Sequence, residues 1–460
     1  MSDTTLGQRL DRVNVTGFHK RVLGLIAAGM FFDSFDIYIA GAVLGAMVQS
    51  GESDLSHNAM FLSATFLGMM LGAWVAGVLG DRYGRRFSYQ FNLALYGGAS
   101  IAGALMPDIN WLILCRFVMG LGMGAEIVVG YGTLSEFIPA RARGRFGTIL
   151  NLIINTSLFL ATFLGWLIIP RFGWRWMFVI VGVGAFVVWF LRKNMPESPR
   201  WLAEHGRVRE AEAIVRTIEA ESGIAPGGPP IQTQPERSIG VGALFGPALL
   251  RNTLVGITVL VALFIVNFAF VAWVPTFLVK QGHGISGSLG LTALMFAGGP
   301  LGSLIGFALA DGVGRKWGIV AGSLVGLVLV VCYAVVESNI GLSIVGFLVT
   351  CVIYVLSSLS VAVYVPELFP TSLRMRGTGL CNAVGRAVSI AIPYGVAGIF
   401  TVAGLTGVMA LIFVTLLVQA VIVGIFGPET KRRSLEELGQ VLDAAAPAGL
   451  VGQASQAGHG

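Results

Sequence analysis

Long apolar segments alternate with short polar ones along almost the whole chain. A membrane-spanning helix needs about 20 mostly apolar residues, and many of these segments reach that length. Polar stretches such as SGESDLSHN, MPDIN, KQGHGISGS and ESNIG separate them. The pattern predicts twelve helices, at 21–48, 58–80, 88–106, 111–137, 146–169, 175–193, 251–278, 288–310, 317–336, 342–366, 378–402 and 407–426.

Composition supports an all-α membrane protein. Of the 460 residues, 55% are hydrophobic and 12% are charged, whereas a soluble chain carries about 25% charged residues. The net charge of +6 does not indicate nucleic acid binding, because the basic residues lie in short loops between apolar segments. The four cysteines lie inside apolar segments at no metal-ligand spacing, and we interpret them as packing residues: Cys115, Cys332, Cys351 and Cys381.

The distribution of basic residues predicts the orientation. Most of the 30 lysines and arginines lie in the two tails, residues 1–20 and 427–460, and in the loops after the even-numbered helices. Because loops rich in Lys and Arg stay in the cytoplasm, we expect both termini to be cytoplasmic. The N-terminal segment lacks a short apolar core with a cleavage site, so we expect helix 21–48 to act as the insertion signal.

Three loop motifs occur twice in the same order at nearly one spacing. DRYGRR from Asp81 corresponds to DGVGRK from Asp311, EFIPARARG to ELFPTSLRMRG, and PESPR to PETKR. Together they predict a parallel repeat of two six-helix bundles, 21–193 and 251–426. Residues 194–250 between them read as short cytoplasmic helices followed by a Pro/Gly-rich linker, GIAPGGPPIQTQPERSIG.

With these motifs the sequence resembles the major facilitator superfamily over nearly its whole length. GVLGDRYGRR, RFVMGLGMG, SEFIPARARGR, GWRWMF and PESPRWL resemble the branch of sugar porters, organic-ion transporters and aromatic-acid symporters. DSFD in the first helix is most similar to proton-coupled aromatic-acid symporters and the wider metabolite:proton symporter group. NAVGRAVSIAIPYG in the eleventh resembles the Arg-bearing helix of aromatic-acid and organic-anion transporters. The second loop copy departs from the family pattern, with Gly312 where the first has Arg82 and Phe307 where the first has Gly77.

Charged residues in the loop motifs are candidates for a cytoplasmic gate. Exposed ion pairs are each worth about 0–1 kcal/mol, but a network of several is able to bias a two-state equilibrium. The alternative is that the positive charges serve topology alone. The candidates are Asp81, Arg85, Glu136, Arg143 and Glu197 in the first half, and Asp311, Arg315, Glu367, Arg376 and Glu429 in the second.

Five ionisable residues fall inside predicted spans: Asp33, Asp36, Arg116, Glu126 and Arg386. A charge at the bilayer centre costs at least about 2.5–3.5 kcal/mol, so such residues are functional candidates. Helix depth, with neighbouring helices as the resemblance implies, predicts a pair between Asp36 and Arg116 that switches the protonation of Asp36. Asp33, one turn earlier, is the second candidate proton carrier. The alternative for these charges is a static buried pair.

Substrate recognition has its own candidates. Arg386 is able to bind a carboxylate bidentately, or to form a bridge between the two bundles with Glu126. Tyr38, Asn267 and Asn382 are further candidate binding residues, although polar residues in such bundles serve packing as often as binding.

These residues predict a proton-driven symporter that imports a small organic acid, an aromatic or heteroaromatic monocarboxylate, and not an enzyme. The alternatives are a carrier of sugars or organic cations, an exporter, and a sensor without net flux. No nucleotide-binding loop is present, so we expect no cofactor besides the coupling proton. The expected partners are the substrate, protons and the lipid bilayer of the inner membrane, with no nucleic acid, and we expect a monomer.

Overall fold

The computed structural model describes residues 9–10, 12–223, 241–247, 249–312, 314–369 and 373–430. Nearly all of the predicted Pro/Gly-rich linker lies outside the described residues, and so do most of the two predicted tails.

The first half of the chain forms six long helices, as the apolar pattern predicts. They are α2 (Gly17–Ser50), α3 (Leu55–Tyr83), α4 (Arg85–Ala104), α5 (Ile109–Phe137), α6 (Ala140–Phe172) and α7 (Arg175–Leu191). Short elements follow: η1 (Arg192–Asn194), α8 (Pro199–Glu204), α9 (Val208–Glu221) and η2 (Val241–Phe245).

The second half forms the other six predicted spans, several of them interrupted. The spans are α10 (Leu250–Phe270) with α11 (Val274–Lys280), α12 (Ile285–Phe296) with α13 (Gly298–Gly312), α14 (Arg315–Val335), α15 (Asn339–Leu359) with η3 (Ser360–Tyr364) and α16 (Val365–Glu367), and α17 (Arg374–Phe426). α17 contains the eleventh and twelfth spans, which separate at Gly404, where φ is 61°. In the described chain, nine helical stretches are long and apolar enough to cross a membrane; α17 counts as one of them, and α7 is a shorter apolar helix.

The polar loops end one helix and begin the next by capping it. In SGESDLSHN, the Asp54 carboxylate accepts a hydrogen bond from the backbone N of His57. In MPDIN, Asp108 accepts from Asn110 and Trp111, and in ESNIG, Ser338 accepts from Gly341. These side chains satisfy backbone N–H groups that have no partner inside the helix, which explains why such short stretches suffice as boundaries.

Glycines bring matching pairs of helices together in both halves. A Cβ at Gly72 or Gly124 would overlap the backbone of the facing helix, so α3 and α5 approach closely. Gly298 and Gly302 have the same relation to α15 from α13. Small residues let helix backbones approach in membranes, and the equivalent positions of Gly72 and Gly302 support the internal repeat.

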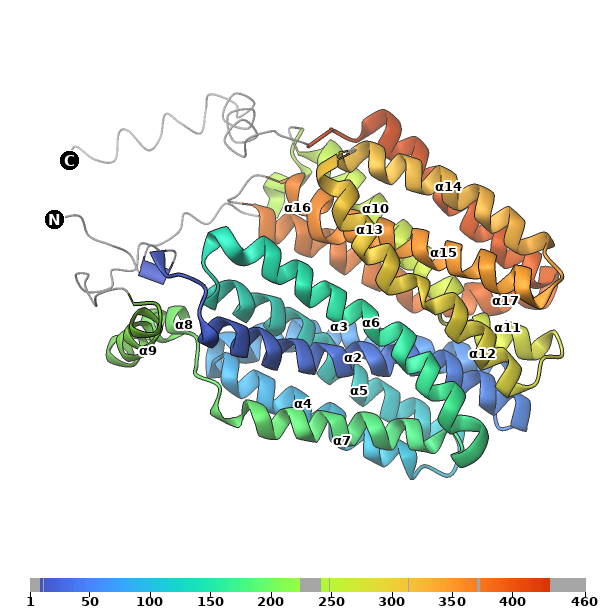
Figure 1. Ribbon diagram of the computed structural model, residues 1–460, viewed down its shortest axis with the longest axis horizontal. Helices are drawn as coiled ribbons and strands as arrows, with labels where there is room; N and C mark the ends of the chain where they lie inside the picture. Colours follow the sequence, from blue (N-terminus) through green and yellow to red (C-terminus); the bar gives the residue numbers. More distant parts are fainter. Residues whose placement is uncertain are drawn as a thin grey trace.

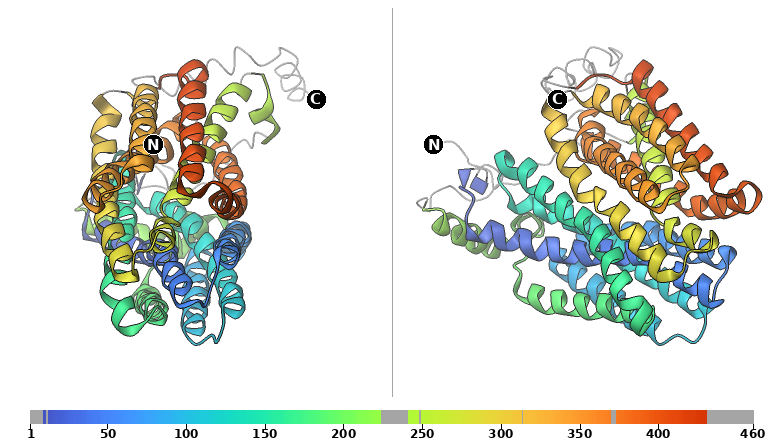
Figure 2. Two further views of the ribbon diagram at one scale, coloured as in Figure 1. Left: turned by 90° about the vertical axis from the view of Figure 1, so that its right-hand side faces the viewer. Right: turned by 45° about the vertical axis from the view of Figure 1, so that its right-hand side comes forward.

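The two halves form separate bundles that meet along one side, seen as blue-to-green and yellow-to-red groups (Figures 1 and 2). α2 begins, and α17 ends, at the end of the molecule where α8 and α9 lie, here called the α9 end (Figure 1). The contacts between bundles lie in the middle and toward the opposite, far end. They join Tyr354 to Tyr38 at 2.7 Å, Asn155 to Ser303 at 2.7 Å, and Ser63 to the Ile390 carbonyl at 2.7 Å.

Candidate functional site

The predicted pair of Asp36 and Arg116 is present inside the first bundle. Arg116 Nη1 lies 2.5 Å from Asp36 Oδ2, and the two side chains are 1% and 0% exposed. Arg116 also donates to Thr65 Oγ1 at 3.2 Å, and its guanidinium lies over the Phe61 ring at 4.8 Å. A charge pair so deeply buried is held by mutual compensation, because each ion alone would be strongly destabilising.

The predicted bridge between Glu126 and Arg386 is wrong for this structure. Glu126 instead pairs with Arg192, at 2.5 Å between Oε1 and Nη1, and both side chains are 1% exposed. Arg192 also donates to the carbonyls of Leu25 and Ile26. The helix face that carries Glu126 points toward α2, where Gly29 leaves room for the pair, so Glu126 is buried inside the first bundle.

Arg192 is the functional candidate that sequence reasoning missed. It follows α7 in the charged stretch LRKN, where it looks like one more loop arginine beside exposed Lys193. The signal that points to it is indirect: an acid inside the apolar helix α5 requires a buried base. Its guanidinium also lies over the Tyr89 ring at 4.9 Å.

Asp33 lies one turn from Asp36 on α2 and is fully buried. Neither of its carboxyl oxygens has a hydrogen-bond partner in the described part of the chain. The charged groups that act on it are Glu126, Arg192 and Asp36.

Arg386 lies on α17 in the second bundle. Its Nε donates to Asn382 Oδ1 at 3.1 Å, and both residues are half-buried. It forms no ion pair with any residue that the structure describes. Next to it, Gly385 packs directly against the Phe264 ring, which stacks in turn on Phe268.

Arg386 and Phe264 lie just inside the contact between the bundles. Phe268, one turn along α10 from Phe264, packs on Phe66 of α3 with ring centroids 4.3 Å apart. One turn along α17 from Arg386 is Ile390, whose carbonyl accepts from α3. Side chains four residues apart share a helix face, so the Phe264 ring faces the inter-bundle space on the α9 side of the Phe66–Phe268 contact, and Arg386 lies one turn to the α9 side of Ile390. Asn267 is half-buried on the same helix as Phe264.

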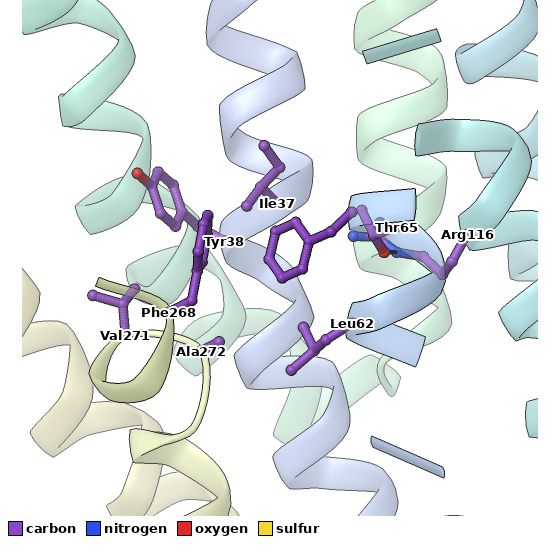
Figure 3. A pocket seen from close by; sticks show the side chains of 9 residues that line it. Ile37, Tyr38, Leu62, Thr65, Arg116, Phe268, Val271 and Ala272 are labelled. Carbon is purple, nitrogen blue, oxygen red and sulfur yellow. Dashed lines mark hydrogen bonds between the residues drawn. The ribbon is translucent and has the colours of Figure 1, made fainter. Parts of the chain in front are cut away.

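A small pocket connects the inter-bundle contact with the first ion pair. It is lined by Tyr38, Thr65 and Arg116 from the first bundle and by Phe268, Val271 and Ala272 from the second (Figure 3). Arg116 therefore contacts Asp36 on one side and borders the pocket on the other.

Six of the ten gate candidates form equivalent clusters at the α9 end of each bundle. In the first, Arg85 pairs with Glu136 at 3.2 Å, and its backbone N donates to Glu197 at 2.9 Å. In the second, Arg315 pairs in the same way with Glu367 at 3.2 Å, and its backbone N donates to Glu429 at 3.1 Å. Each cluster ties three helix ends within one bundle, which supports the predicted repeat.

The loop glycines before these arginines have positive φ in both copies, 95° at Gly84 and 103° at Gly314. Only a residue without a Cβ adopts this conformation easily while a glutamate packs against it. Arg376 is exposed. The side chains of Asp81, Arg143 and Asp311 lie outside the described residues, so their predicted gate role stays a prediction.

Comparison with known proteins agrees with this arrangement. A family model described as "Sugar (and other) transporter" matches residues 24–442. The inner membrane metabolite transport protein YdjE of Escherichia coli is 38% identical over 450 residues, covering 95% of this chain and 98% of that protein. The niacin transporter NiaP of Acinetobacter baylyi is 29% identical over 439 residues, covering 94% and 99%.

Solved structures share the fold. A crystal structure of the D-xylose-proton symporter matches with a TM-score of 0.71 at 16% identity, covering 91% of this chain and all of that one. The partially occluded inward-open conformation of the xylose transporter XylE from E. coli matches with a TM-score of 0.72. With its two bundles of six helices, the chain belongs to the sugar (and other) transporter family of the major facilitator superfamily and is a multi-pass membrane transporter of small molecules.

Proposed function

We propose that this transporter is a proton-coupled symporter that imports a small organic acid, an aromatic or heteroaromatic carboxylate. The observation that carries the proposal is Arg386, half-buried on α17 next in sequence to Gly385, which packs on the Phe264 ring. A guanidinium matches a carboxylate bidentately, and Arg386 has no acidic partner in the described chain. The Phe264 ring offers an apolar face for an aromatic ring. The relative named as a niacin transporter supports this substrate class, because niacin is a heteroaromatic carboxylic acid.

Proton coupling is assigned to Asp36 and Arg116. While the guanidinium stays within 2.5 Å, it favours the ionised carboxylate, and when it withdraws, the buried carboxyl favours the protonated form. Arg116 also borders the inter-bundle pocket, so movement between the bundles acts on it directly. The structural match to a proton symporter supports the coupling ion. We place the α9 end in the cytoplasm, in agreement with the basic loops. We expect the protein to lie in the inner membrane as a monomer.

Transport assays in proteoliposomes test the substrate class. Arg386→Ala abolishes uptake of niacin, whereas the charge-neutral Asn382→Ala weakens it, because Asn382 orients the guanidinium through one hydrogen bond. Arg175→Ala is the matched control, since Arg175 lies exposed at the far end. Unchanged niacin uptake by Arg386→Ala contradicts the carboxylate role.

A sugar is the second candidate, favoured by the family model and by the xylose transporters that share the fold. The hydroxyls of Tyr38 and Tyr354, which meet between the bundles, are suitable sugar partners. Thermal shifts of the purified protein with niacin and with D-xylose separate the two classes, because the bound ligand stabilises the fold.

A further inference from the structure

The interior of the first bundle holds more ionisable groups than the Asp36–Arg116 pair uses. Along one face of α2 lie Gly29, Asp33 and Asp36, spaced four and three residues apart. The Glu126–Arg192 pair packs at Gly29, and Arg116 packs at Asp36. At 1.5 Å per residue, the two ion pairs are separated along α2 by roughly 10 Å, with Asp33 between them.

α5 lies on the opposite side of this row and carries one member of each ion pair. Arg116 and Glu126 lie at the two ends of its glycine-rich stretch. Between them, Gly122 packs against Tyr96 of α4, so that this tyrosine reaches the level of Asp33. Tyr96 is fully buried, its hydroxyl has no partner in the described chain, and it is within electrostatic reach of Asp33, Asp36 and Glu126. The elements concerned, α2, α4, α5 and α7, all belong to the blue-to-green bundle (Figure 1).

Several polar atoms in this row are buried and unpartnered within the described residues. They are both carboxyl oxygens of Asp33, Oδ1 of Asp36, Oε2 of Glu126 and the hydroxyl of Tyr96. Buried polar groups in native proteins nearly always have partners, so a row of acids that each have at least one unpartnered oxygen indicates a place for protons. Three acids face two arginines, which leaves the row with one excess negative charge. One bound proton makes it neutral, as a low-dielectric interior requires.

We propose that Asp36, Asp33 and Glu126 form a proton relay inside the first bundle. The Glu126–Arg192 pair lies nearest the α9 end, and Glu126 is the last group in the relay to hold the proton. The proposal rests on the proposed proton coupling and adds the route by which the proton leaves. Asp33 holds the proton at rest. When Asp36 is protonated from the far side, the Asp33 proton passes to a carboxylate oxygen of Glu126 and Asp36 returns its proton to Asp33. Glu126 then releases its proton at the α9 end as Arg192 pairs with it again.

The relay keeps the proton apart from the substrate. Asp33, Asp36, Glu126 and Arg192 are each 1% exposed or less, and only Arg116 of the five charged groups lines the inter-bundle pocket. The charged and titratable groups around Asp33 are Asp36 on its own helix, Glu126 on α5, Arg192 after α7 and Tyr96 on α4.

Niacin transport in proteoliposomes tests the relay. Glu126→Gln and Asp33→Asn lose accumulation driven by an imposed proton gradient but keep counterflow exchange, which requires no net proton transfer. Glu210→Gln is the matched control, because Glu210 is exposed on α9 in a pair with Arg207, and it behaves as the wild type. If Glu126→Gln does not fold, Glu126→Gln with Arg192→Gln removes the pair as a unit, with the same expected results.

Two outcomes overturn the relay. Full accumulation by Glu126→Gln shows that the proton does not pass through Glu126. If Asp36→Asn abolishes accumulation in the same assay, only the relay fails and the proposed proton coupling stands. Loss of exchange together with accumulation in Glu126→Gln assigns Glu126 to substrate binding or folding instead.

A measurement without substrate separates the relay from the substrate assignment. Infrared spectra of the reconstituted wild type and of Asp33→Asn are compared at neutral pH. The wild-type spectrum minus the Asp33→Asn spectrum is expected to contain a protonated carboxyl band. If niacin is not transported, the substrate class is wrong, and this band alone decides the relay. A wild-type protein without the band overturns it.

Discussion

The Asp36–Arg116 pair leads to a quantitative prediction about stability. In Arg116→Gln, Asp36 is buried without its counter-charge and has to take up a proton, and in Asp36→Asn the guanidinium is buried without its counter-charge. Removing one partner of a buried pair costs about 3–5 kcal/mol in the free energy of unfolding. The double variant, Asp36→Asn with Arg116→Gln, removes both charges and loses mainly hydrogen bonds, each worth about 1 kcal/mol.

The double variant is therefore expected to be more stable than the sum of the single effects predicts, by about 3 kcal/mol or more. Unfolding in mixed detergent and SDS measures the four proteins of this cycle. The control is the cycle at Arg207 and Glu210, an exposed charge pair at 2.7 Å whose side chains are 50% and 57% exposed and for which no measurable coupling is expected.

Additive effects of the two single substitutions would refute the reasoning. They would mean that Asp36 and Arg116 do not compensate each other in the folded protein. The proposed switch of Asp36 protonation by the nearby guanidinium would then lose its physical basis, whereas the family assignment would be unaffected.

Two further predictions concern helix packing and the N-terminal segment. Gly124→Ala lowers the unfolding temperature because its Cβ overlaps the α3 backbone, whereas Gly132→Ala on the same helix meets open space and does not; equal effects would contradict the packing argument. Burial raises the pKa of Glu212, but hydrogen bonds from Arg9 and Arg216 outweigh it and hold the pKa below 4.5. Because this folded-state pKa is depressed, the Arg9–Glu212 ion pair contributes its full stability above the unfolded-state value and loses it as the pH falls through the folded-state pKa, while Arg9 keeps its hydrogen bonds to Glu219. Proteolysis near Arg9 as a function of pH measures this weakening, and Glu212→Gln removes that part of the pH dependence while the Arg9–Glu219 contact stays.

The depth of each site residue in the membrane could be predicted from the sequence. Helix ends follow from apolar length and capping residues, and the rise per residue then gives the level of every side chain. Depth, together with the helix neighbours that the family resemblance implies, predicts the Asp36–Arg116 pair, and the structure has the two side chains in contact. The repeat was visible for the same reason, because Arg85 and Arg315 follow equivalent helix ends and make equivalent contacts.

Which side of a helix faces which neighbour was decided only by the tertiary structure. Glu126 and Arg386 lie at similar depths, so depth alone made them candidate partners, but the packing of α5 against α2 turns Glu126 toward Arg192. In a membrane, apolar residues cover lipid-facing and protein-facing surfaces alike, so the hydrophobic pattern contains little information about helix rotation. Sequence therefore determines the order and depth of the charges in this transporter, and close packing around glycines such as Gly29 and Gly122 determines which of them meet.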